Sequence, residues 1–136
     1  MLVLDSGAVS RLAERTRAAA ALIAALREEG LWPPFVPSVV LVECLRGHAG
    51  KDANENRLLK TCDLGTEVTE SLARRAAFLR ARAQRGSAVD ALVIAAAEPG
   101  GMVLTSDPRD LQAIATYADD VAVERIRLAT VSRGRT

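Results

Sequence analysis

Short apolar runs of strand type alternate with helical patterns along the whole of this sequence. The strand-like runs cover 2–4, 33–37, 65–68, 102–106 and 121–126, and helical patterns cover 15–29, 38–46, about 56–62, 69–86, 87–98 and 107–117. Such alternation predicts a mostly parallel sheet with helices on both faces, a three-layer α/β/α fold. A length of 136 residues suits one domain over 1–136, whose last few residues we expect to be a flexible tail.

Three of the helical segments have informative patterns. The segment 69–86 places Leu72, Ala76 and Leu79 on one face, which is typical of an amphipathic helix. The segments 38–46 and 87–98 are apolar on nearly every side, so both are predicted to be buried. Ser38 and Gly47 are the predicted first cap and the end of the helix over 38–46.

Composition excludes several kinds of protein. A net charge of +1 gives no overall attraction to nucleic acid or membranes, so any polyanion would have to meet a local arginine cluster. Two cysteines and one histidine are too few for a tetrahedral zinc site of the usual kind, and Cys44 and Cys62 are expected to be reduced thiols inside helices. No membrane span or signal segment is evident, which predicts a cytoplasmic protein.

Aspartates stand directly after two of the strand-like runs. Asp5 follows "LVL" and Asp107 follows "MVLTS", so in a parallel sheet both carboxylates would lie at the same edge, where ligands bind. Each also has a structural interpretation, because either could cap the helix that follows it. Asp90 has one too, since it lies three residues after Ser87, as in a capping box.

Glu43 is harder to explain as a structural residue. It lies within "SVVLVECL", where a largely buried helix would leave its charge in need of a partner. Arg46 could be that partner, and a metal ion or a substrate group is at least as good a candidate.

Four carboxylates that converge on one pocket need a cation. At 4 Å and an effective dielectric constant near 20, two like charges repel by about 4 kcal/mol. A site made only of oxygen ligands suits Mg²⁺ or Mn²⁺. Such ions activate water and stabilise phosphate transition states, so the pattern indicates hydrolysis of phosphodiesters.

The order of "LVLDSGAVS", "VVLVECLRG", "SAVDALVIAAAE" and "VLTSDPRDL" resembles that of PIN-domain ribonucleases, most closely the VapC-type toxins of bacterial toxin–antitoxin pairs. The resemblance implies a Mg²⁺- or Mn²⁺-dependent endoribonuclease of PIN-like fold. It further implies a homodimer inhibited by a cognate antitoxin protein. The implied catalytic and metal-binding residues are Asp5, Glu43, Asp90 and Asp107. The same resemblance gives supporting positions to Ser6, Thr105 and Arg46, whereas Asp110 is assigned a capping role by preference.

The RNA substrate would be held by its phosphates. Only 3% of the residues are aromatic, which disfavours base stacking, and the helix over 69–86 is rich in arginine. The candidate phosphate contacts are Arg74, Arg75, Arg82 and Arg85, with Arg80 on the same helix. A solvated helix face explains these arginines equally well.

Three alternatives share parts of this pattern. A PIN nuclease of RNA processing would carry the same residues, and an inactive binding module could keep an acidic pocket. A phosphoacceptor receiver or an aspartate phosphatase normally has a lysine in its active site. The only lysines here, Lys51 and Lys60, lie in or beside the polar mid-chain segment and not next to the acids. The phosphatase would also want an acid at position 7, where this chain has glycine.

Overall fold

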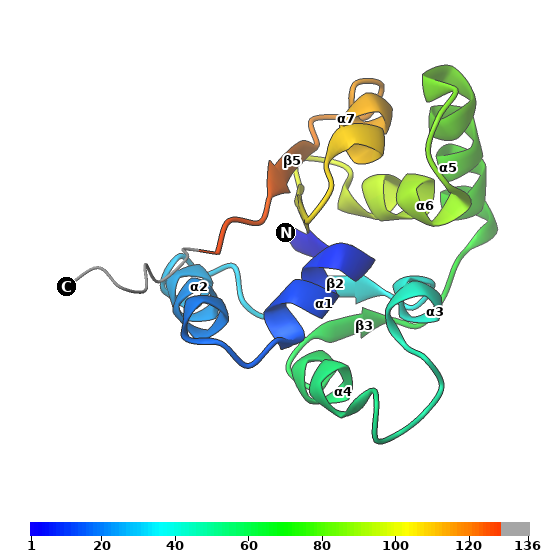
Figure 1. The fold of residues 1–136 in the computed structure, drawn as a ribbon. Helices are drawn as coiled ribbons and strands as arrows, with labels where there is room; N and C mark the ends of the chain where they lie inside the picture. Colours follow the sequence, from blue (N-terminus) through cyan, green and yellow to red (C-terminus); the bar gives the residue numbers. More distant parts are fainter. Residues whose placement is uncertain (129–136) are drawn as a thin grey trace.

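Five parallel strands form one sheet in the computed structural model, which describes residues 1–128 (Figure 1). Their order across the sheet is β3-β2-β1-β4-β5, so the first strand lies at the centre. The strands are β1 (Leu2–Leu4), β2 (Phe35–Pro37), β3 (Asp63–Gly65), β4 (Met102–Thr105) and β5 (Ala122–Arg125). The flexible tail expected at the end of the chain lies outside the described residues.

Helices cover both faces of this sheet. One layer contains α1, α2, α3 and α4, which pack around α1, and the other contains α5, α6 and α7 (Figure 1). The helices are α1 (Ser6–Ala13), α2 (Arg17–Glu28), α3 (Val40–Cys44), α4 (Ala53–Leu59), α5 (Glu70–Ala83), α6 (Ala88–Ala97) and α7 (Arg109–Ala115). The predicted three-layer fold with a parallel sheet is therefore confirmed.

The core lies where β1 and β4 meet α6. All three residues of β1 are buried, as are Val103 on β4 and Val93 and Ile94 on α6. A central parallel strand is covered on both faces, which explains why its sequence is apolar without alternation. The prediction that the helix over 87–98 is buried is confirmed.

Several boundaries differ from those predicted. The strand expected over 65–68 is β3 at Asp63–Gly65, because its pairing with β2 sets its limits and its exposed position at the sheet edge leaves no apolar pattern. The helix expected near 56–62 is α4, which starts after Asp52 and ends before a tight turn at Thr61. Cys62 therefore lies beyond the helix, whereas Cys44 is in α3. Helix α1 was not predicted as an element of its own.

The helix expected over 38–46 was the largest error. Helix α3 has only five residues, Ser38 provides no side-chain cap, and Gly47 lies beyond the end of the helix. Only Val40 and Cys44 are buried in it, while the side chain of Val42 is 81% exposed. A single turn at the rim of the fold has too little contact with the core to bury all of its sides.

Both cysteines are free thiols. Burial raises the pKa of each to about 11, so neither has the thiolate character of a reactive cysteine. Among the described residues, no helix is both long and apolar enough to cross a membrane.

Candidate functional site

Asp5 lies where the sheet and α1 join. Strands β1 and β4 pair in parallel with Leu4 opposite Leu104, so their carboxyl ends meet at one edge. Asp5 is the N-cap of α1: its Oδ1 accepts a hydrogen bond of 2.8 Å from the backbone N–H of Ala8, and its Oδ2 accepts one from the hydroxyl of Thr105. Capping therefore uses one carboxylate oxygen and leaves the other facing the end of β4.

Burial is the main cause of a raised pKa at Asp5. The hydrogen bonds from Thr105 and Ala8 oppose this effect, and the negative charges of Asp90 and Glu43 add to it. Asp5, Glu43 and Asp90 are therefore close enough for their negative charges to repel one another. A divalent cation would relieve that repulsion.

Thr105 holds the ends of β1 and β4 together. Its side chain is completely buried, and its hydroxyl donates to Asp5 while accepting a 3.1 Å hydrogen bond from the backbone N–H of Asp107. A buried hydroxyl with both partners in place fixes the orientation of the Asp5 carboxylate.

Asp90 is part of a complete capping box at the start of α6. Its Oδ2 accepts the backbone N–H of Ser87 at 3.0 Å, and its own N–H donates to Ser87 Oγ at 3.0 Å. No hydrogen bond to Oδ1 is present among residues 1–128, and Asp90 lines the same cavity as Asp5. The structural role thus occupies one oxygen and leaves the other available to a ligand.

Asp107 is paired with a neighbour on the chain. Arg109 approaches its two oxygens at 3.2 and 3.3 Å, which lowers the pKa of Asp107. The pair is exposed to solvent, with 62% of the Asp107 side chain accessible. The expected cap is weak, since the Arg109 backbone N–H lies 3.4 Å from Oδ1.

Glu43 is exposed, so the prediction of a buried glutamate is wrong. Because α3 is so short, Glu43 faces away from the core and accepts a 3.1 Å hydrogen bond from the hydroxyl of Ser6. Ser6 directly follows Asp5 and lines the acidic cavity, whereas Glu43 is not among the residues that line it. Glu43 therefore lies beside the other acids, joined to them through Ser6.

Arg46 does not pair with Glu43 among the described residues. Its backbone N–H donates to Asp52, and its guanidinium lies 3.4 Å from the carbonyl oxygen of Lys51. Asp52 was not singled out in the sequence, yet it is buried and also accepts the backbone N–H groups of Gly47 and His48. These hydrogen bonds lower the pKa of Asp52 and organise the loop after α3.

The four candidate phosphate contacts are spread over different surroundings. Arg74 pairs with Glu70 on the same helix, and Arg75 forms a two-point pair with Glu98 at 2.8 and 2.7 Å. The guanidinium of Arg82 lies near the rings of Phe78 and Tyr117. Of the four, only Arg85 lines the acidic cavity.

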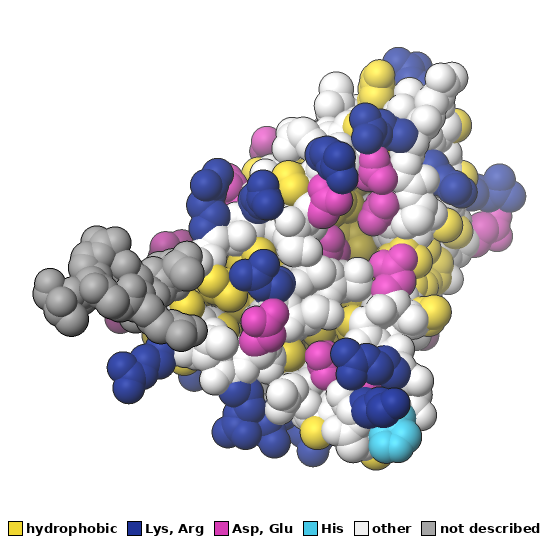
Figure 2. Space-filling model, viewed as in Figure 1, with side chains coloured by type: hydrophobic (Ala, Val, Ile, Leu, Met, Phe, Trp, Pro, Cys, Tyr) yellow, Lys and Arg dark blue, Asp and Glu magenta, His cyan; other side chains and the backbone are white. Residues whose placement is uncertain are grey.

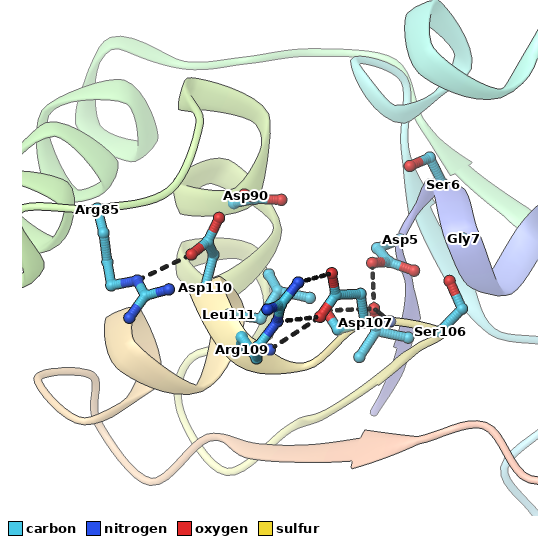
Figure 3. Close-up of a pocket in the computed structure, with 11 residues that line it drawn as sticks. Asp5, Ser6, Gly7, Arg85, Asp90, Ser106, Asp107, Arg109, Asp110 and Leu111 are labelled. Carbon is cyan, nitrogen blue, oxygen red and sulfur yellow. Dashed lines mark hydrogen bonds and ion pairs between the residues drawn. The ribbon is translucent and has the colours of Figure 1, made fainter.

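The acidic cavity has a volume of about 390 Å³ (Figure 3). Figure 3 shows two arginine–carboxylate pairs around it, Arg109 with Asp107 and Arg85 with Asp110, the latter at 2.8 Å. Asp110 thus faces a guanidinium and accepts no backbone N–H group among the described residues, contrary to its expected role as a cap. In the space-filling view, acidic side chains with basic ones beside them gather over this region (Figure 2).

The sequence analysis missed several residues that line this cavity. Gly7 has a steric reason to be glycine, because a Cβ atom there would lie 2.1 Å from Ser106 Oγ. That approach brings the start of α1 against the end of β4. In the sequence, the only sign of this contact is that Gly7 lies close to Asp5 and Ser106 lies next to Asp107. The other lining residues not identified in advance are Ser106, Arg109 and Leu111.

The donor set fits a hard divalent cation held by few protein ligands. Among residues 1–128, no three acidic, histidine or cysteine side chains stand close enough to enclose a metal ion. Mg²⁺ commonly binds one or two carboxylates and completes its shell with water and substrate phosphate. Asp5 and Asp90, each with an oxygen toward one cavity, match that requirement.

Comparison with known proteins identifies the family. A model of the PIN domain matches residues 2–117. The solved structure of FitAB bound to the IR36 DNA fragment has a TM-score of 0.62 and 20% identity, with 92% of this chain and 94% of the other covered, which is a likeness of fold. Curated protein sequences gave no significant match. PIN domains are in general nucleases, hydrolases that act on phosphodiester bonds. Because the family model spans most of the sequence, this chain belongs to the PIN domain family.

Proposed function

We propose that this chain is a metal-dependent endoribonuclease and the toxin component of a toxin–antitoxin pair. The observation that carries the proposal is the cavity in which Asp5 and Asp90 present carboxylates at the carboxyl end of the sheet. Membership of a family of nucleases supports phosphodiester hydrolysis there. The resemblance to VapC-type toxins supports RNA as the substrate and a toxin role.

Asp5 and Asp90 would hold Mg²⁺ or Mn²⁺ directly, and Glu43 and Asp107 would act through water or at a second ion. Divalent ions are general in PIN nucleases. When bound, such an ion supplies an activated water and charge stabilisation at the phosphate. Thr105 keeps the Asp5 carboxylate oriented toward the cavity, and Ser6 positions Glu43 beside it. These residues prearrange negative charge before any substrate arrives.

RNA would be gripped mainly through its phosphates. Arg85 is the best-placed contact because it lines the cavity itself, where its guanidinium can exchange Asp110 for a phosphate. Arg74, Arg75 and Arg82 extend the basic surface along α5, although the two-point bond to Glu98 restrains Arg75. Affinity should therefore fall with salt and depend little on base sequence.

A cognate antitoxin protein and a homodimer are the partners that the VapC resemblance implies, and a cytoplasmic location fits them. The similar fold of FitAB, solved on a DNA fragment, is compatible with such an assembly. Co-expression with a candidate antitoxin protein, followed by size measurement of the purified complex, would test both partners.

RNA cleavage by the purified protein tests the activity. A pool of single-stranded and structured RNA is incubated with Mg²⁺, Mn²⁺ or EDTA, beside the Asp5→Asn and Asp90→Asn variants. Asp120→Asn is the matched control, since Asp120 is exposed and outside the acidic cavity. We expect cutting that requires the metal, disappears in both site variants and persists in the control.

Two results would reject the proposal. Cleavage that survives in both site variants would mean that the acidic cavity is not the active site. A folded protein that neither cuts the pool nor binds Mn²⁺ would point to a binding module with a structural acidic pocket. Cleavage without growth arrest on expression would favour RNA processing over a toxin role.

A further inference from the structure

A second cavity lies on another part of the molecule, between the end of α1, α2, α4 and the segment before β2. Its volume is about 180 Å³, and it shares no lining residue with the acidic cavity. Leu12 and Leu58, both buried, contribute to an apolar floor. Nothing in the proposed nuclease chemistry uses this cavity.

Three arginines from three different segments line this second cavity. Arg15 follows α1, Arg27 is on α2 and Arg57 is on α4, and no aspartate or glutamate lines the cavity with them. None of the three forms an ion pair within residues 1–128, whereas each arginine around the acidic cavity does. Figure 2 shows basic side chains gathered along the lower edge of the molecule between α2 and α4. Three arginines that line one cavity without a carboxylate among them favour an anion from solution.

Trp32 supplies a second, independent observation. It lines the same cavity, and its Nε1 is buried without a hydrogen-bond partner in the described part of the chain. Buried indole N–H groups nearly always find an acceptor, so an unmet donor on a residue that lines a cavity is a group that a ligand oxygen could satisfy. Two interactions help to position the arginine side chains of this cavity. The Cζ atom of Arg27 lies 6.0 Å from the centre of the Trp32 ring, and Arg57 Nη1 donates a 3.0 Å hydrogen bond to Asn54 Oδ1.

We propose that this cavity binds a phosphate group. Guanidinium forks pair with phosphate oxygens in two-point contacts, and the indole N–H adds a donor from another direction. Donors carried by three different segments suit the tetrahedral oxygens of phosphate better than the two coplanar oxygens of a carboxylate. The apolar floor suits the C–H groups of the sugar attached to the phosphate. The ligand is thus a phosphate carried by a nucleotide or by an RNA strand, and the inference does not depend on the nuclease activity.

The experiment uses the fact that Trp32 is the only tryptophan. An ¹⁵N-labelled sample therefore gives one indole N–H resonance, which reports directly on this cavity. The full chain is titrated, in EDTA and at constant ionic strength, with inorganic phosphate, a nucleoside 5′-monophosphate or a short RNA. We expect a saturable downfield shift of the indole proton as it gains a hydrogen bond. Acetate, a single carboxylate, should produce a much smaller shift at matched ionic strength.

Matched variants tie the shift to the arginines. Arg57→Gln and Arg27→Gln should each weaken binding by about tenfold, the usual worth of one charged hydrogen bond. Arg17→Gln is the control, because Arg17 is an exposed arginine at the start of α2 that is not among the lining residues. Asp90→Asn should bind as the wild type does, which separates this inference from the proposed function. Circular dichroism verifies the fold of each variant.

The two sources of phosphate give different results, and both support the site. RNA that binds far more tightly than the mononucleotide identifies a strand, and equal affinity identifies a free nucleotide. An indole resonance that does not move with any of the three probes would overturn the inference. So would a shift that is the same in Arg57→Gln as in the wild type.

Discussion

Ser87 and Asp90 allow the capping and the proposed catalytic roles of one carboxylate to be separated. Each residue accepts a backbone N–H from the other at 3.0 Å, yet only Asp90 carries a charge into the acidic cavity. Ser87→Ala removes half of the capping box and leaves that charge. Asp90→Asn keeps an amide oxygen for the Ser87 N–H and removes the charge. Ser87→Ala should therefore lose stability and keep most of its RNA cleavage, whereas Asp90→Asn should keep its stability and lose RNA cleavage.

The expected magnitudes follow from the capping geometry. Loss of a serine N-cap costs about 1 kcal/mol of unfolding free energy. With an unfolding entropy of about 2.1 cal/mol/K per residue over 136 residues, this lowers Tm by about 3.5 °C. Asp90→Asn loses about 0.3–1 kcal/mol of helix-dipole interaction, which relief of the repulsion from Asp5 offsets. Its Tm should stay within about 2 °C of the wild type or rise.

Cleavage should respond in the reverse order. Loss of a direct metal ligand should lower the rate of RNA cleavage by more than about 100-fold, the upper limit for a residue that only supports a ligand. Ser87→Ala should keep the rate within about tenfold, the lower limit for a residue that supports a ligand, because the backbone N–H that Asp90 Oδ2 accepts is still present. The assays are thermal unfolding followed by circular dichroism and RNA cleavage in Mg²⁺ on the same samples.

One pattern would refute this reasoning. If Asp90→Asn cut RNA nearly as fast as the wild type while Ser87→Ala and Asp90→Ala shared one loss of stability, Asp90 would be a cap and nothing more. The proposed ligand set would then lose one of its two central members.

Three further predictions concern the surroundings of the site and the fold. Thr105→Val leaves an oxygen of Asp5 without its donor and should lower the unfolding free energy by about 1–3 kcal/mol in urea denaturation, while Thr105→Ser should stay close to the wild type. Asp52 has a lowered pKa, so its stabilising effect is complete above the ordinary value of 3.8 and is lost as pH falls through the lower folded value. The Tm difference between wild type and Asp52→Asn should therefore shrink below pH 3.8, and a difference that is constant with pH would contradict this account. Cys44 and Cys62, with pKa values of about 11, should react slowly with a disulfide reagent at pH 8 in the native protein and quickly in urea. Fast labelling of the native chain would show that burial does not protect them.

Local patterns in the sequence determined the class of fold. Buried parallel strands must be apolar throughout, and buried helices must be apolar on most sides, so 2–4, 102–105 and 87–98 could be identified from their residues alone. The aspartates that follow two of these strands then pointed to one edge of the sheet. The parallel pairing of β1 with β4 confirms that geometry.

Tertiary contacts decided what local pattern could not. The helix of Glu43 looked buried because its neighbours are apolar, but burial depends on what packs against a helix, and α3 is a single turn at the rim. The limits of strand β3 depend on its pairing with β2, and the residues of β3 have no apolar pattern that would predict those limits. The ion-pair partners of Arg75 and Arg85 lie in other elements, and Asp52 accepts hydrogen bonds across a loop. The spacing of residues in the sequence therefore does not predict these contacts.

The layered fold, the family resemblance and the acids that follow the strands could therefore be predicted from the amino-acid order, because each depends on residues close together in the chain. The folded structure was needed to show which oxygens face the acidic cavity, which arginines are already paired and which arginines without an ion pair in residues 1–128 line a cavity with Trp32. Those properties depend on distances between segments far apart in sequence, which are fixed when the core packs.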